Sequence, residues 1–148
     1  MTATGLELVS LGEMDFTLDD QPIDFSQTVT YKGFRLLHDV PNLASSFGYI
    51  NASWTLRADL TCEYVCRLLN HMTTSGTTAV RITPPTRRCH HDPATVDRRL
   101  LGAGYMQRAM PMLPKQGDRE PWLNTQDYAK DKVLFRRGEV DDGVMVFR

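Results

Sequence analysis

The sequence contains few cysteines and no long hydrophobic run. Its three cysteines are an odd number, so they cannot form the complete disulfide framework that holds many small secreted domains together, and we expect a reducing environment. A membrane-spanning helix needs about 18 or more consecutive apolar residues, and no such run is present. No signal peptide is recognisable either. These observations predict a cytoplasmic protein.

An excess of one charge is also missing. The chain has 17 lysines and arginines against 18 aspartates and glutamates, which gives a formal net charge of -1. Nucleic acids and anionic lipid surfaces attract proteins with a basic excess or a polybasic patch. We therefore expect neither a nucleic-acid partner nor a membrane partner. With 148 residues, of which 41% are hydrophobic, the chain is long enough to bury a core.

The sequence also lacks the short motifs of phosphate binding and catalysis. It has no G-x-G-x-x-G fingerprint and no Walker loop, and the glycines of Gly102-Ala103-Gly104 follow no predicted strand. No serine lies in a nucleophile elbow, and no pair of carboxylates has helical spacing beside a predicted pocket. The pairs Asp19-Asp20 and Asp141-Asp142 are interpreted as turn residues. We thus identify no catalytic residue from the sequence.

A metal site is the next possibility. Cys62 and Cys66 are one helical turn apart, and Cys89-His90-His91 follows later, a set of ligands that zinc could use. However, Cys62 and Cys66 lie on or beside the apolar face of a predicted helix, where cysteine commonly acts as a small hydrophobic residue. His90 and His91 are expected in an exposed loop. The sequence therefore predicts no metal site.

The strongest structural pattern is a helix from about Ser53 to about Ser75, with Gly76 as its stop. Apolar residues four apart predict its buried face, and a second apolar row lies beside them: Leu56, Leu60, Tyr64, Leu68 and Met72, with Cys62, Val65 and Leu69. Four charged residues are expected largely off this face: Arg57, Asp59, Glu63 and Arg67. The spacing of Glu63 and Arg67 predicts an ion pair within the helix.

Strands are predicted before this helix. Alternation around a turn at residues 19–22 indicates a hairpin, which Phe16 and Leu18 enter and Ile23 and Phe25 leave. Further strands are expected at 28–31, with a possible continuation at 34–37, and at 43–48. A turn is expected at Val40-Pro41-Asn42. Together with the helix, these strands predict an α/β fold.

The second half of the chain is less regular. Residues 84–93 are polar and contain several prolines, so we expect an irregular segment. Short helices are predicted over 105–110 and 128–135, with a loop over 114–121 between them. A terminal strand is predicted over 144–147.

The join between the strand at 43–48 and the helix is Asn51-Ala52-Ser53-Trp54. One interpretation is a helix cap, in which Asn51 or Ser53 accepts hydrogen bonds from free amides and Trp54 fills a gap. The other is a binding site, because a helix N-terminus after a buried strand presents free N–H donors and a partial positive charge. In open α/β sheets, ligands bind just beyond the carboxyl ends of strands, where this join would lie. The residues alone leave both interpretations open.

An ordered series of motifs resembles the C-terminal part of class B flavoprotein monooxygenases, the Baeyer–Villiger-type group. The motifs are "TATGL" at 2–6, "YKGF" at 31–34, "VPNLASSFGYINASWTLRADL" at 40–60, "YVCRLLNHM" at 64–72, "GYMQRAM" at 104–110, "LPKQG" at 113–117, "PW" at 121–122, "RRG" at 136–138 and "VDDG" at 140–143. Each motif is weak alone, but their order over essentially the whole chain is specific.

The resemblance implies a Rossmann-like fold with two dinucleotide-binding domains, one for FAD and one for NADPH. Such enzymes insert an oxygen atom beside a ketone carbonyl or oxidise a sulfur. It implies that Gly5, in the family's Ala-Thr-Gly motif, lies near the junction of the two domains, and that residues 43–48 are the last strand of the FAD domain. It further implies that Asn51, Ala52 and Ser53 let backbone amides approach the flavin ring, while Trp54 walls the pocket.

The resemblance also implies a division of the chain. Residues 1–76 would form the C-terminal part of the FAD-binding domain, and residues 77–148 an irregular C-terminal extension with short helices. The nucleotide-binding fingerprints of the family are not in this sequence. We therefore expect a C-terminal portion that is inactive alone and needs a separate N-terminal portion as its partner. The alternative is a non-catalytic remnant, or an interaction module that completes a separate N-terminal chain.

Overall fold

The computed structural model describes residue 5 and residues 7–33, 36–83 and 104–148, and these residues form a mixture of helices and short strands. The helices are α1 (Trp54–Ser75), α3 (Gly104–Ala109) and α4 (Tyr128–Arg137), with 3-10 turns η1 (Ser10–Glu13), η2 (Phe25–Gln27) and η3 (Met110–Met112). The strands are β1 (Thr17–Leu18), β2 (Gln21–Pro22), β3 (Thr30–Tyr31), β4 (Leu36–Leu37), β5 (Val80–Ile82) and β6 (Met145–Phe147). The mixture is compatible with the predicted α/β class.

Helix α1 forms where the apolar periodicity predicts it. It starts after Ser53 and ends at Gly76, whose left-handed backbone (φ 70°) is the conformation that glycine adopts most readily at a helix end. Leu60, Tyr64 and Leu68 are buried, as expected from their spacing.

Two details of the predicted helix face are wrong. Cys62 and Leu69, from the second apolar row, are exposed, whereas Arg57 is buried although its charge suggested the opposite. The buried face of α1 is therefore narrower than predicted, and it includes the cation Arg57.

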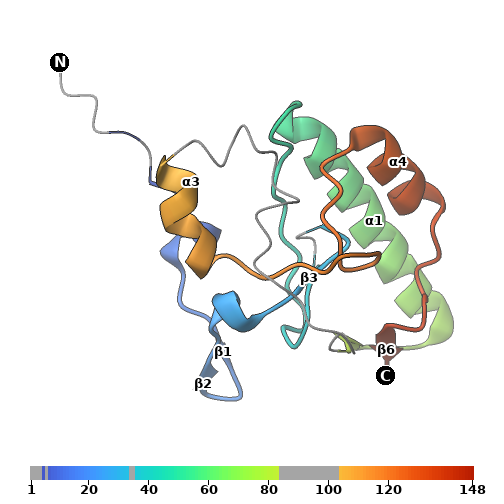
Figure 1. Ribbon diagram of the computed structural model, residues 1–148. Coiled ribbons are helices and arrows are strands. Elements are labelled where there is room, and N and C mark those ends of the chain that lie inside the picture. Colours follow the sequence, from blue (N-terminus) through green and yellow to red (C-terminus); the bar gives the residue numbers. More distant parts are fainter. Residues whose placement is uncertain (1–4, 6, 34–35, 84–103) are drawn as a thin grey trace.

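Helices α1 and α4 lie side by side, at the right of the view in Figure 1. A ring contact joins them, because Tyr64 and Phe135 meet edge to face with centroids 6.0 Å apart. The buried core cluster around this contact takes its members from α1, α4 and strands β3, β4, β5 and β6: Tyr31, Leu36, Leu60, Tyr64, Leu68, Ile82, Phe135 and Met145. Residues on both sides of position 76 thus share one core.

The described strands form three separate two-stranded antiparallel sheets. The predicted hairpin at residues 16–25 is confirmed as β1–β2, with a tight turn at Asp19 and Asp20, both in the left-handed region (φ 50° and 62°). The predicted position of the second strand is wrong, because Gln21 and Pro22, which were expected in the turn, form β2, and Phe25 already begins the turn η2. The strand predicted at 28–31 appears as β3, which pairs with β4, and the turn at Val40-Pro41-Asn42 is also found.

The strand predicted at residues 43–48 is not found, although the structure describes this segment in full. The segment is less buried than a buried strand would be, because residues 43–47 are half-buried or exposed and only Gly48 is buried. A strand also needs a neighbouring chain for a hydrogen-bonded ladder, and no described strand pairs with this segment. Residues 43–48 therefore form an irregular segment before the join.

The second half follows the predicted order of elements. Helix α3 runs into η3 at Pro111, residues 114–121 are a loop, α4 covers the predicted 128–135, and β6 closes the chain. Strand β5, which pairs with β6, was not predicted. The loop lies against β3, because the Lys115 amide donates to the Thr28 carbonyl and the Thr30 amide donates to the Lys115 carbonyl, both at 2.9 Å. The predicted irregular segment at 84–93 lies outside the described residues.

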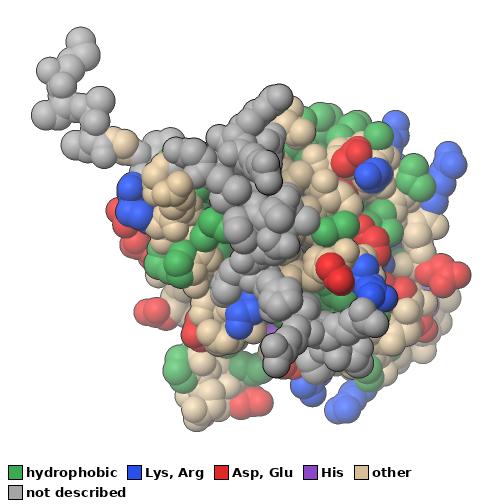
Figure 2. Space-filling view, viewed as in Figure 1, with side chains coloured by type: hydrophobic (Ala, Val, Ile, Leu, Met, Phe, Trp, Pro, Cys, Tyr) green, Lys and Arg blue, Asp and Glu red, His purple; other side chains and the backbone are tan. Residues whose placement is uncertain are grey.

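The visible surface carries both charge signs in alternation, with hydrophobic side chains in several separate places between them (Figure 2). This pattern agrees with the balanced net charge. Among the helices that the structure describes, none is long and apolar enough to span a membrane.

Candidate functional site at the start of helix α1

The join before α1 is open to solvent. Asn51, Ala52 and Ser53 are all exposed, and Ser53 occupies the N-cap position with extended backbone. Its side chain makes no capping hydrogen bond, and its hydroxyl instead lies 2.8 Å from that of Thr55. The first turn contains no acidic residue. Backbone amides at the start of a 22-residue helix are therefore left without a side-chain acceptor from Ser53, and an anionic or electron-rich group would be favoured there.

Trp54, the first residue of α1, is held against the segment that precedes the helix. Its indole packs on the Phe47 ring, with centroids 5.2 Å apart, yet 57% of the residue stays exposed. Gly48 lies directly beneath: a Cβ at this position would come within 2.1 Å of the indole. The absence of a side chain at Gly48 is therefore what allows Trp54 to lie flat over the chain.

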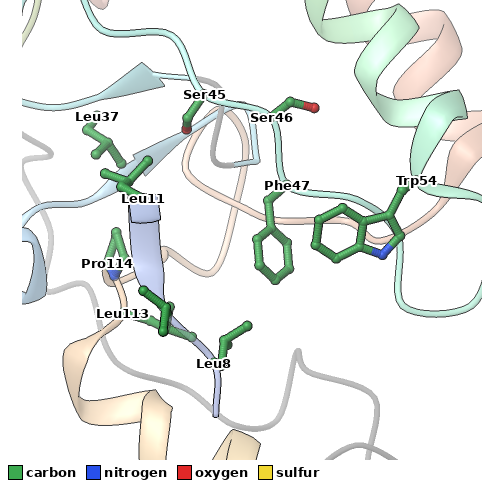
Figure 3. A pocket seen from close by; sticks show the side chains of 10 residues that line it. Leu8, Leu11, Leu37, Ser45, Ser46, Phe47, Trp54, Leu113 and Pro114 are labelled. Carbon is green, nitrogen blue, oxygen red and sulfur yellow. The ribbon is translucent and has the colours of Figure 1, made fainter. Parts of the chain in front are cut away.

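Trp54 and Phe47 form one side of a cavity of about 240 Å³ (Figure 3). The opposite side comes from residues 8–11 and from Leu113 and Pro114, which directly precede Lys115. The lining residues are Leu8, Val9, Leu11, Leu37, Ser45, Ser46, Phe47, Trp54, Leu113 and Pro114. The sequence analysis proposed only Trp54 among these as a site residue, because nothing local indicated that residues 8–11, Leu37 and residues 113–114 lie beside it.

Gly5, the remaining residue of the predicted site, is exposed with a left-handed backbone (φ +83°), and the space where a side chain would stand is open. It does not line the cavity, although Leu8, three residues later, does. Asn51, Ala52, Ser53 and Trp54 are consecutive exposed residues and form one surface, whereas Gly5 is not part of the cavity lining that Trp54 joins.

A buried carboxylate behind the join fixes both of its ends. Asp131, in α4, is 1% exposed and accepts a hydrogen bond from the Tyr49 hydroxyl at 2.6 Å, just before the join. It also lies 3.4 Å from the guanidinium of Arg57, just after the join. The Thr125 hydroxyl donates to its other oxygen. The amide of Ile50 is held as well, because it donates to the Gln126 side chain at 3.0 Å.

Arg57 is the most enclosed cation of this region, at 1% exposed. Its Nη2 donates to Asn124 at 2.6 Å, and its guanidinium lies over the Tyr49 ring. A Cβ at Gly33 would stand 2.2 Å from Nη2, so glycine is needed there. Burial lowers the pKa of Arg57, while Asp131 and then Tyr49 oppose that shift. Its Nε and Nη1 atoms have no hydrogen-bond partner in the described part of the chain.

The sequence did contain a signal for this network. Arg57 precedes Leu60, Tyr64 and Leu68 by three, seven and eleven residues, the spacing of one helix face, so periodicity alone placed it inside. Its charge led to the opposite prediction, because an arginine is rarely fully buried without a partner. The partner, Asp131, lies far along the chain and could not be identified from spacing.

A second buried cation, Lys32, lies in the turn after β3 and is 3% exposed. Its ammonium is 3.1 Å from the Asp142 carboxylate and donates to the Tyr64 hydroxyl at 3.2 Å. Tyr31 also donates to Asp142, at 2.5 Å, and burial together with these neighbours raises the pKa of Tyr31 well above its usual range. Asp142, interpreted from sequence as a turn residue, therefore anchors the C-terminal segment to the core.

The described residues contain no group of three or more potential ligands that could hold a metal ion. Cys62 and Cys66 are free and exposed on α1. Cys89, His90 and His91, the other candidate ligands, lie outside the described residues.

Comparison with known proteins gives the class to which the chain is related. No protein-family model matches it, and no solved structure matches it. Curated proteins do match over nearly its whole length, and they are FAD-containing monooxygenases. The chain is thus a homologue of part of FAD-containing monooxygenases, which confirms the resemblance seen in the sequence.

Three of these relatives illustrate the match. The FAD-containing monooxygenase EthA of Mycobacterium tuberculosis is 44% identical over 142 residues, which are 96% of this chain and 28% of EthA. The probable FAD-binding monooxygenase AlmA of Acinetobacter baylyi is 40% identical over 99% of this chain and 29% of AlmA. The putative FAD-containing monooxygenase MymA of M. tuberculosis is 40% identical, again over 99% and 29%. The chain therefore spans less than a third of the length of these relatives.

Proposed function

We propose that this chain is the C-terminal part of an FAD- and NADPH-dependent monooxygenase of the Baeyer–Villiger type, which inserts oxygen into ketones or oxidises sulfur compounds. The proposal includes a Rossmann-like arrangement for the whole protein and activity only together with its N-terminal portion. The observation that carries it is the exposed start of α1, where Ser53 forms no side-chain cap, in a chain 44% identical to part of an FAD-containing monooxygenase.

The residues present at the join fit one edge of a flavin ring. Asn51, Ala52 and Ser53 are small and exposed, so a planar ring can approach the first-turn amides closely. The positive end of α1 and the lack of an acidic residue in its first turn favour the negative charge of a reduced flavin. FAD, when bound, supplies the oxygen-activating chemistry. The chain's own contribution is to donate hydrogen bonds, to hold the ring edge and to exclude water with Trp54.

The first test replaces small residues of the join in the chain combined with a complementary N-terminal portion. Asn51→Leu and Ser53→Val should block the approach of the ring, weaken FAD binding and lower the reduction potential of the flavin, because the reduced form is held less well. The Ser53 side chain makes no capping hydrogen bond, so Ser53→Ala should cost less than the roughly 0.5–2 kcal/mol typical of a lost side-chain cap.

The measurements are the free energy of unfolding, the FAD affinity and the flavin potential of each variant. Thr77→Val, at a half-buried position just beyond the other end of α1, is the control and should leave both flavin properties at the parent values. If stability alone falls in the Asn51 and Ser53 variants, these residues are caps. If the combined protein holds no FAD at all, the alternative of a non-catalytic remnant or interaction module is favoured.

A further inference from the structure

His38 completes the hydrogen-bonded ladder between β3 and β4 with its side chain. The register of this pair, in which Thr30 lies opposite Leu37, places Val29 opposite His38. The His38 amide donates to the Val29 carbonyl at 3.1 Å, as it does in a regular antiparallel ladder. The returning bond is different, because the Val29 amide donates to Nδ1 of the His38 imidazole at 2.8 Å. An ionisable side chain therefore holds the end of a buried strand pair.

This bond fixes the protonation state of the imidazole. A backbone N–H can only donate, so Nδ1 is the unprotonated acceptor, and the proton of the neutral ring lies on Nε2, which is 3.4 Å from the Asp39 carboxylate. In the imidazolium ion both nitrogens carry hydrogen, and two donors would then face each other at Nδ1. Because Val29 is only 5% exposed, water cannot easily replace the acceptor that its amide would lose.

The same strand pair holds the loop that follows η3. Residues 28–30 exchange two backbone hydrogen bonds with Lys115, both at 2.9 Å. Leu113 and Pro114, which directly precede Lys115, line the cavity beside α1, and so does Leu37 in β4. Residues 28–30 therefore hold two walls of this cavity through hydrogen bonds of their backbone.

The charged groups of the described chain that face His38 come from three elements. Asp39 follows it in the turn, Arg81 belongs to β5 and donates to Asp39 at 2.7 Å, and Lys115 lies in the loop after η3. Burial lowers the pKa of His38. Asp39 opposes this shift, whereas the charges of Arg81 and Lys115 add to it. With a lowered pKa in the folded state, the stabilisation is present above the unfolded value, about 6.5, and is lost as the pH falls from there through the folded value.

We propose that His38 is a proton-sensitive switch, in which protonation breaks the bond from the Val29 amide and loosens the β3–β4 pair together with the loop at residues 113–115. The inference goes beyond the proposed function, because it concerns the conformation of this chain and requires no flavin. Its consequence is that the walls of the cavity beside α1 are held near neutral pH and are released in mild acid.

Amide hydrogen exchange in the 148-residue chain tests the switch. Between about pH 7.5 and about pH 5, the protection of the His38 and Lys115 amides should fall at least about tenfold after correction for the intrinsic exchange rate, because a buried donor loses its acceptor. The amide of Leu68, in the interior of α1, is the internal reference and should keep its protection.

His38→Asn separates the hydrogen bond from the charge. The side-chain oxygen of asparagine is bonded to the same carbon as Nδ1 of histidine, so it can accept from the Val29 amide, but it does not ionise. This variant should keep the protection of the Lys115 amide at both pH values. His71→Asn is the matched control, because His71 is also half-buried but belongs to α1 and packs on Phe147. The control should show the same fall in protection as the parent.

A parent chain whose protection stays constant over this pH range overturns the proposal, and so does a folded His38→Asn variant that loses protection as the parent does. If His38→Asn does not fold, nitrogen NMR shifts of the parent imidazole provide the decision. They should show an unprotonated Nδ1 at neutral pH and a titration midpoint below about 6.5. A proton on Nδ1 at neutral pH, or a midpoint at or above that value, also overturns the proposal.

Discussion

At the scale of single residues, Asp131 determines the shape of the join. Tyr49 precedes the join and Arg57 follows it, and the carboxylate of Asp131 binds both side chains. Because Asp131 and Arg57 are each 1% exposed, water does not replace either partner. The exposed residues between them are then held at a fixed position although they make few contacts of their own. A site that must meet a partner surface benefits from such rigid support.

Asp131→Asn should therefore destabilise the chain strongly. Removal of one member of a buried ion pair leaves the other charge uncompensated, at a cost of about 3–5 kcal/mol. Asp127→Asn is the control, since Asp127 caps α4 through its side chain and asparagine is an equally good cap. Urea unfolding of the two variants checks the prediction. Equal midpoints for Asp131→Asn and Asp127→Asn would show that the buried pair contributes nothing.

A double substitution separates the pair from its surroundings. If the cost of Asp131→Asn arises from the stranded charge of Arg57, then Arg57→Met combined with Asp131→Asn should lose less stability than the sum of the single changes. Methionine keeps much of the packing volume of the side chain while removing the charge.

At the scale of secondary-structure elements, α1 and α4 are joined by polar contacts at their edges. Arg136 donates two hydrogen bonds to the Glu63 carboxylate, at 2.6 and 2.7 Å. Arg67 donates to the carbonyls of Phe135 and Gly138, and so satisfies acceptors at the C-terminal end of α4. Both arrangements fix the register of one helix against the other.

The Glu63–Arg136 pair makes a testable contribution to the pH dependence of stability. The hydrogen bonds from Arg136, with its charge, hold the pKa of Glu63 below its usual value. A lowered pKa in the folded state means that the stabilisation is present above the unfolded value and is lost as the pH falls through the folded value. Glu63→Gln should therefore be less stable than the parent at neutral pH, and the difference should shrink as the pH falls below the usual pKa of a glutamate, about 4.3.

Urea unfolding at several pH values measures this effect, with Glu13→Gln as the control because Glu13 is exposed and distant in sequence from α1 and α4. Both partners of the pair are largely exposed, so added salt should also reduce the difference. A constant difference between Glu63→Gln and the parent at every pH and salt concentration would contradict the assignment.

How far the sequence predicted these elements depends on whether the determining contacts are local. The bounds of α1 followed from periodicity and from Gly76, and the hairpin followed from Asp19 and Asp20, because each signal lies within the element itself. The predicted Glu63–Arg67 pair was wrong for the opposite reason: α4 brings Arg136 to Glu63, and the carbonyls of α4 attract Arg67. The candidate site divides in the same way, since Trp54 was identified but the cavity lining was not.

At the scale of the whole molecule, the described chain has one core but represents only part of its relatives. Tyr31, Tyr64 and Phe135 meet in the same cluster, so residues before and after position 76 stabilise each other. The division at 76 into an FAD-domain part and an extension stays a prediction about the complete protein. Several large hydrophobic side chains remain exposed, among them Trp54, Leu69 and Val133. Single exposed apolar side chains of this kind are common on protein surfaces and do not by themselves mark a contact surface.

The last prediction concerns flavin binding by the chain alone. The start of α1 can stabilise a negative charge by about 1 kcal/mol, up to about 2 in favourable geometry. Retention through gel filtration needs at least micromolar affinity, which corresponds to about 8 kcal/mol. No glycine-rich loop in this sequence supplies amides for the FAD pyrophosphate. The purified 148-residue chain, mixed with FAD and passed through gel filtration, should therefore be colourless, whereas the same chain combined with an N-terminal portion should retain the visible flavin band. A stoichiometric flavin band in the chain alone would mean that the join and the apolar cavity bind FAD far more strongly than a helix terminus explains.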